Sequence, residues 1–129
     1  MNKLLKSTLA STSALLIMGS VPTVNAAVGD YGVDNSIYQG TYGKFGYAKD
    51  KFMISQIGGY TGYGTYDQST YATQVQSAIA QGKRAHTYVW WQNITDYATA
   101  DAVLDHFLPK VQTPKGSIVA LDIESGGQN

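Results

Sequence analysis

The sequence has no cysteine, only three prolines and equal numbers of acidic and basic side chains. The absence of cysteine excludes a disulfide framework and any zinc site built on thiolates. The balanced charge provides no strongly basic surface of the kind that binds nucleic acid or anionic lipid. Glutamate is nearly absent as well, since Glu124 is the only one. These absences favour a single small domain held together by a hydrophobic core.

Residues 1–26 have the features of a secretory signal peptide. Lys3 and Lys6 give a positive start, residues 15–18 are apolar, and Ala26 ends a small-residue cleavage site. Serine and threonine interrupt the apolar stretch, so it is too weak for a stable membrane anchor. We therefore predict a secreted protein whose mature chain has a slight excess of negative charge.

Alternating β-branched and aromatic residues predict four short strands, at 31–34, 51–57, 84–90 and 117–124. Helical spacing of apolar residues predicts two helices between the later strands, at 69–81 and 99–108. Gly82 follows the first helix as an expected cap, and Pro109 ends the second.

The predicted strands that start at 51, 84 and 117 are equally spaced along the chain. The spacing has the size of a β-strand, α-helix, β-strand unit, so we expect a parallel sheet with helical crossovers. The first crossover, at 39–50, has no helical period and is expected to be a loop.

The last predicted strand carries most of the functional information. Val119, Leu121 and Ile123 share one face and are suited to packing under helices, whereas Asp122 and Glu124 share the other. Chemistry in parallel α/β folds takes place at the carboxyl ends of the strands, which is where these two acids lie.

Two carboxylates at this spacing have Cα atoms roughly 6.5–7 Å apart. Repulsion and partial burial should raise the pKa of one of them, giving a proton donor beside an ionised partner, as glycoside cleavage requires. The alternative is a solvated pair. Asp34, at the end of the first strand, is expected at the same rim, with a turn-initiating role as its alternative.

Aromatic residues are the candidates for binding a sugar, because their faces stack on sugar rings. The candidates are Tyr88, Trp90 and Trp91 at the end of the third strand, with five tyrosines in the rim loops, namely Tyr38, Tyr42, Tyr60, Tyr63 and Tyr66. The alternative for each tryptophan is a place in the core.

The remaining motifs carry less information about function. The glycine-rich segment 58–64 lacks the Lys-Ser/Thr of a phosphate loop, so we expect a mobile loop that faces the substrate. We expect His86 to be a satisfied interior histidine and His106 to be solvated. No metal-ligand motif is present, and we expect neither a metal nor another cofactor.

These motifs, in this order after a signal peptide, resemble glycoside hydrolase family 25, the lysozymes that are N-acetylmuramidases. Residues 32–40 resemble the opening motif of that family, residues 82–91 its third-strand region, and residues 117–124 its Asp-x-Glu strand. The resemblance implies an α/β fold, an irregular TIM-like (β/α) barrel with parallel strands. Residues 27–129 would be its N-terminal half, so the barrel would be incomplete in this chain.

The implied activity is hydrolysis of the β-1,4 bond between N-acetylmuramic acid and N-acetylglucosamine in peptidoglycan, outside the cell. By resemblance Glu124 is the general acid, Asp122 orients or stabilises the reacting sugar, and Asp34 lines the site. The resemblance does not choose between retention and inversion. It does not give the oligomeric state, and glycan strands are the expected partner.

Departures from the family pattern also lead to expectations. Asn35 replaces an aliphatic residue, and the second strand ends in Ser55-Gln56-Ile57-Gly58 instead of a Lys-Thr/Ser-Glu-Gly-like pattern. The later strands of the family's barrel have no counterpart here, so we predict little or no activity for this chain alone. Four strands would also leave an open parallel edge, which is an aggregation hazard. Two alternatives are a non-catalytic cell-wall glycan-binding module and a chitinase-like barrel.

Overall fold

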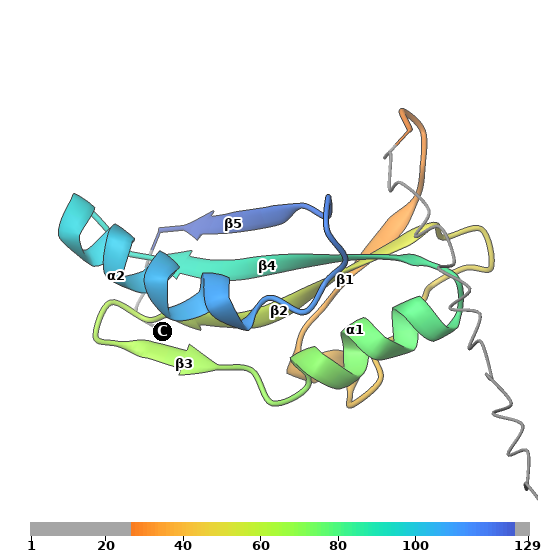
Figure 1. The fold of residues 1–129 in the computed structure, drawn as a ribbon, viewed down its shortest axis with the longest axis horizontal. Helices are drawn as coiled ribbons and strands as arrows, with labels where there is room; N and C mark the ends of the chain where they lie inside the picture. The colour runs from red at the N-terminus through yellow and green to blue at the C-terminus, as the bar shows by residue number, and fades with distance from the viewer. Residues whose placement is uncertain (1–26, 126–129) are drawn as a thin grey trace, which may run out of the picture.

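The computed structural model describes residues 27–125, so the predicted signal peptide at 1–26 lies outside the described residues. The described chain forms one sheet with two α-helices and two short 3-10 turns (Figure 1). The elements are β1 (Gly32–Asn35), η1 (Ile37–Gln39), β2 (Phe52–Tyr60), β3 (Thr65–Asp67), α1 (Tyr71–Ala80), β4 (Arg84–Gln92), α2 (Tyr97–Phe107), η2 (Leu108–Lys110) and β5 (Val119–Glu124).

The strands β1, β2, β4 and β5 are parallel and adjacent in that order, and β3 pairs antiparallel with β2. One edge of β2 pairs with β4, so β1 and β3 share its other edge. On that edge, β1 pairs with the first residues of β2 and β3 pairs with the last residues of β2. A curled parallel sheet with helices is the arrangement of an incomplete α/β barrel. The predicted fold class is therefore confirmed.

Both predicted helices are present, and their ends follow local capping chemistry. Beyond α1, Gly82 adopts a φ of 67°, and the N–H of Lys83 donates to the carbonyl of Ala78, which is the expected glycine cap. The helix α2 begins two residues earlier than expected, because the Asp96 side chain accepts from the Thr99 N–H at 2.8 Å.

The hydrophobic core lies between one face of the sheet and the two helices. Burial of this apolar surface is the main force that holds the helices on the sheet. The core residues are Met53, Ile57, Tyr71, Val75, Ala78, Ala85, Val89, Trp91, Val103 and Phe107. The opposite face of the sheet is left free for a cavity.

A β-bulge interrupts β2 at Ile57. Gln56 pairs with Tyr88, but Gly58 pairs with the very next residue of β4, Val89. The extra residue reverses the alternation of side chains along the rest of β2. Tyr60 consequently lies opposite Trp91, on the helix-covered face.

The prediction of a mobile loop at 58–64 is wrong in its first half, because Gly58 and Gly59 belong to β2. A Cβ on Gly58 would lie 2.1 Å from the backbone oxygen of Tyr66, and one on Gly59 would lie 2.7 Å from the Cβ of Trp90. These glycines therefore serve close packing, since they let β3 and Trp90 approach the strand. The hairpin strand β3 was not expected from the sequence.

The strand β5 differs from its expected environment. In the sheet register, Val119, Leu121 and Ile123 lie on the same side as Thr87, Val89 and Trp91, which is the helix side. Nevertheless they are 36%, 41% and 74% exposed, so the expected packing under helices is not found within residues 27–125.

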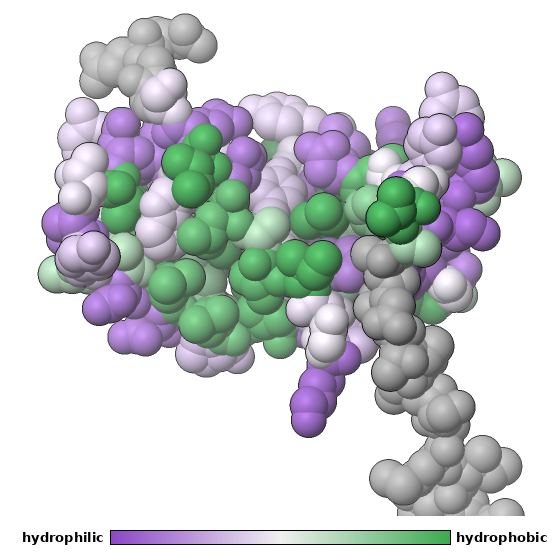
Figure 2. Space-filling model, turned by 90° about the horizontal axis from the view of Figure 1, so that it is seen from above, coloured by the Kyte–Doolittle hydropathy of each residue, from purple (hydrophilic) through white to green (hydrophobic). Residues whose placement is uncertain are grey.

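Figure 2 shows apolar side chains gathered into a broad patch on the side of the molecule where β5 is the uppermost strand in Figure 1. In the described part of the chain, β5 also has no strand on its outer edge. No helix in this part is long and apolar enough to cross a membrane.

Candidate functional site

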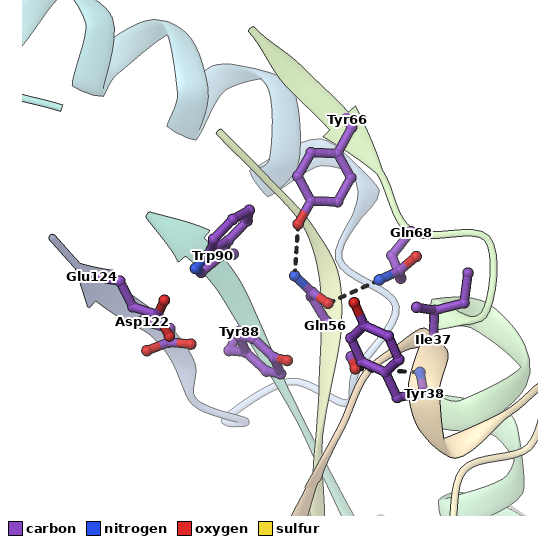
Figure 3. A pocket seen from close by; sticks show the side chains of 10 residues that line it. Ile37, Tyr38, Gln56, Tyr66, Gln68, Tyr88, Trp90, Asp122 and Glu124 are labelled. Carbon is purple, nitrogen blue, oxygen red and sulfur yellow. Dashed lines mark hydrogen bonds between the residues drawn. The ribbon is translucent and has the colours of Figure 1, made fainter. Parts of the chain in front are cut away.

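A cavity of about 410 Å³ lies on the face of the sheet opposite the helices (Figure 3). Two carboxylates lie at one end of it and a group of amide and hydroxyl side chains at the other, with aromatic rings between them. The lining residues are Ser36, Ile37, Tyr38, Gln56, Tyr66, Gln68, Tyr88, Trp90, Asp122 and Glu124.

The two carboxylates are those predicted from the last strand. Asp122 pairs with Trp90 in the sheet and Glu124 with Gln92, and both acids are exposed to solvent. Partial burial raises the pKa of Asp122, and the negative charges of Glu124 and Asp34 add to the rise. Asp122 is therefore a carboxyl group of the cavity whose pKa is raised.

Asp34 lies on the cavity side of the sheet but does not line the cavity. It is exposed on β1 and pairs with Ile54. Its charge still reaches the site: burial first, then the charges of Asp34 and Asp122, raise the pKa of Tyr88 to about 12. Asp34 thus acts on the cavity through its field, and Tyr88 keeps its phenolic proton at neutral pH.

Of the eight aromatic candidates, Tyr38, Tyr66, Tyr88 and Trp90 line the cavity. Tyr42 and Tyr63 are exposed and do not line it. Trp91 does not, because it is 8% exposed and packs in the core on the other face. Tyr60 does not either: the bulge turns it towards the helices, where it packs against the core, and its hydroxyl donates to the Gly62 carbonyl at 3.3 Å.

Sequence reasoning did not select Gln56 and Gln68, two amide side chains of the cavity wall. The Nε2 of Gln56 donates to the hydroxyl of Tyr66 at 2.9 Å, and the Nε2 of Gln68 donates to the Oε1 of Gln56 at 2.8 Å. Gln56 gave a signal, because Ser55 and Gln56 are polar residues within a largely apolar strand. Gln68 gave none, since its position depends on the hairpin strand β3. Tyr66 was expected as an aromatic residue of a rim loop, whereas the structure places it in β3.

The two histidines play structural parts. The buried Nδ1 of His86 accepts from the Ile118 N–H at 3.1 Å, which confirms a satisfied interior histidine. The side chain of His106 is 34% exposed, and its Nε2 lies 2.9 Å from both Asp67 and Lys110. This cluster ties β3 to the end of α2. Within residues 27–125 no group of three or more potential ligands could hold a metal ion.

The family model of glycosyl hydrolases family 25 matches residues 33–129. The chain belongs to this family. The matched span begins at the second residue of β1 and contains β2 to β5 and every residue that lines the cavity. Membership in family 25 implies a lysozyme-type glycoside hydrolase that acts on peptidoglycan. Comparisons with curated proteins and with solved structures give no significant match.

Proposed function

We propose that the cavity is the active site of a secreted N-acetylmuramidase, which hydrolyses the β-1,4 bond between N-acetylmuramic acid and N-acetylglucosamine in peptidoglycan. The observation that carries the proposal is the joint presence of Asp122 and Glu124 with aromatic walls in one cavity of a family 25 chain. Paired carboxylates beside a sugar-binding surface are what glycoside cleavage requires.

In this proposal Glu124 is the general acid, which protonates the oxygen of the leaving sugar. The assignment follows the resemblance of residues 117–124 to the Asp-x-Glu strand of family 25 and does not follow the pKa criterion, because the pKa of Asp122 is raised. Asp122 orients the reacting sugar and stabilises the positive charge that develops on its ring. The field of Asp34 favours the same charge, because its negative charge already influences Asp122 and Tyr88. These roles hold for either retention or inversion.

The rings of Tyr38, Tyr88 and Trp90 are the proposed sugar contacts. Tyr38 is 89% exposed and Trp90 only partly buried, so both offer surface to a ligand. Aromatic faces stack on the apolar faces of sugar rings. The protonated hydroxyl of Tyr88 adds a hydrogen-bond donor between the acids and the rest of the cavity.

We also propose that residues 27–125 work poorly by themselves. Both carboxylates lie on β5, whose outer edge is unpaired within the described residues and whose side chains are mostly exposed. Catalysis depends on holding such groups within a fraction of an ångström, and an edge strand without support holds them less tightly.

Product analysis tests the chemistry. Purified peptidoglycan is incubated with the chain, and new reducing ends are identified by mass spectrometry. We expect slow release of fragments that end in N-acetylmuramic acid, which Glu124→Gln abolishes. The matched control Asp101→Asn changes an exposed acid of α2 and should leave the rate unchanged.

The other outcomes are equally informative. New reducing ends at N-acetylglucosamine would replace the muramidase assignment by a different glycosidase specificity. Binding of glycan without any Glu124-dependent product would favour a non-catalytic glycan-binding module. Rapid bulk lysis of cell walls would contradict the proposed weak activity of the chain alone.

A further inference from the structure

The polar network of Gln56, Tyr66 and Gln68 has no part in the catalytic roles proposed above. It lies at the end of the cavity away from Asp122 and Glu124, and Figure 3 shows its two hydrogen bonds. Gln56 is only 7% exposed. Burying an amide side chain at a cavity wall costs free energy unless its hydrogen-bond partners are well placed. We therefore ask what this network does for a ligand in the cavity.

The hydrogen bonds of this network run in one direction. Gln68 donates to Gln56, and Gln56 donates to the hydroxyl of Tyr66. Since that hydroxyl accepts from Gln56, it keeps its own proton to donate. Tyr66 donates no hydrogen bond to any residue in the described range. Burial also raises the pKa of Tyr66, so the proton stays in place at neutral pH. The network therefore presents one oriented donor.

The ring of Tyr66 is held firmly. It makes an edge-to-face contact with Trp90, with ring centroids 6.2 Å apart at 67°. Gly59 lies beneath it, and a Cβ there would lie 3.0 Å from the Tyr66 oxygen. The adjoining Asp67 is anchored by Lys110 through oxygen–nitrogen distances of 2.9 and 2.7 Å. An anchored donor of this kind can select a ligand group by position.

The lining indicates what kind of acceptor fits. Neither lysine nor arginine lines the cavity, whereas two carboxylates do, so an anionic ligand group is disfavoured. Ile37 and Tyr38 lie near the same end and offer apolar contact. A neutral carbonyl that carries a methyl group satisfies both conditions, and in a glycan this describes an N-acetyl group.

We propose that the Tyr66 hydroxyl donates a hydrogen bond to the N-acetyl carbonyl of the sugar at this end of the cavity, with Gln56 and Gln68 as its positioning residues. This rests on the proposed function, because it takes a glycan as the ligand. Tyr66 is then a specificity-determining residue that separates N-acetylated glycans from plain ones.

Calorimetry with two neutral trimers tests this: the N-acetylglucosamine trimer and the β-1,4-linked glucose trimer, which differs from it only in carrying a hydroxyl in place of each acetamido group. The full chain carries Glu124→Gln so that no hydrolysis occurs. One well-placed hydrogen bond predicts a preference of about tenfold for the acetylated trimer. Tyr66→Phe should remove the preference by weakening only the acetylated trimer, and Gln68→Met should reduce it partly.

Tyr63→Phe is the control, because Tyr63 is 89% exposed and does not line the cavity. Gln68→Met keeps the Tyr66 ring, so it also provides the test if Tyr66→Phe does not fold. Equal binding of the two trimers, no binding of either, or a preference that survives in both variants would overturn the proposal. Failure of peptidoglycan hydrolysis with the preference intact would count against the proposed function alone.

Discussion

The strands β2 and β5 flank the same neighbour, β4, yet they differ in nearly every physical respect. Five consecutive residues of β2, from Ser55 to Gly59, are buried, whereas every residue of β5 except Ala120 is exposed. The central strand provides Gln56 of the polar network, residues 66–68 beside it provide Tyr66 and Gln68, and the edge strand provides the carboxylates. The proposed recognition is thus anchored on the buried centre of the sheet, while the proposed chemistry lies on the strand with the least support.

The largest expected difference concerns stability. Phe107 is 1% exposed and packs against Gly58 of the central strand, so Phe107→Ala should cost about 3–5 kcal/mol of unfolding free energy. Ile123 on β5 is 74% exposed, and Ile123→Ala should change it by about 0.5 kcal/mol or less. Urea unfolding followed by tryptophan fluorescence measures both. Similar losses for the two variants would refute the contrast between centre and edge.

An intermediate effect on the free energy of unfolding is expected at His86. This residue of β4 accepts a hydrogen bond from Ile118, which immediately precedes β5. Burial, with a contribution from the charge of Arg84, lowers the pKa of His86 in the folded state. The unfolded chain therefore takes up the proton more readily. The stabilisation is complete above the unfolded pKa of about 6.5 and is lost as the pH falls through the folded value.

His86→Asn keeps an oxygen that can accept from Ile118 but removes the titration. Urea midpoints measured between pH 7.5 and pH 5 should fall less steeply in this variant than in the original chain. Identical slopes would show that His86 is not the group responsible. An NMR titration of the imidazole provides an independent check on the direction of its pKa shift.

The smallest expected effect is a change in the pKa of Asp122 on the exposed edge strand β5. Removing the charge of Glu124 by Glu124→Gln should lower the pKa of Asp122, and Asp34→Asn should lower it by less, in the order of their contributions. Both effects should shrink in high salt, because the groups are exposed and screened. Carboxyl NMR titrations measure them, with Asp101→Asn as the control. A larger shift from Asp34→Asn would contradict the proposed ranking.

Regular periodicity explains what the sequence could predict. The helices were visible because their apolar residues repeat at helical spacing, and Gly82 marked the end of the first. The carboxylate pair was visible because β5 is a regular strand in which Asp122 and Glu124 share a face. Each of these features depends on residues close together in the chain.

The features that escaped prediction depend on contacts between distant segments. Nothing local distinguishes Trp90 from Trp91, because the register with β5 and the position of the helices decide which ring is buried. The strand β3 has only three residues, and it forms because Gly58 and Gly59 leave room for it. The hydrogen bonds between Gln56 and the hairpin follow from that pairing.

The bulge at Ile57 also has an evolutionary consequence. Regular alternation after Gln56 would place Gly58 and Tyr60 on the cavity side, but the extra residue places Gly59 there and sends Tyr60 to the core. Deletion of the extra residue would remove the bulge and still leave Gly59 opposite Trp90 and Tyr60 opposite Trp91. Loss of the bulge at unchanged strand length would instead shift the last residues of β2 by one position along β4 and bring the Tyr60 ring to the cavity side. The lining of this cavity can therefore change through the pairing register of one strand without any substitution, a route that comparison of aligned side chains alone does not reveal.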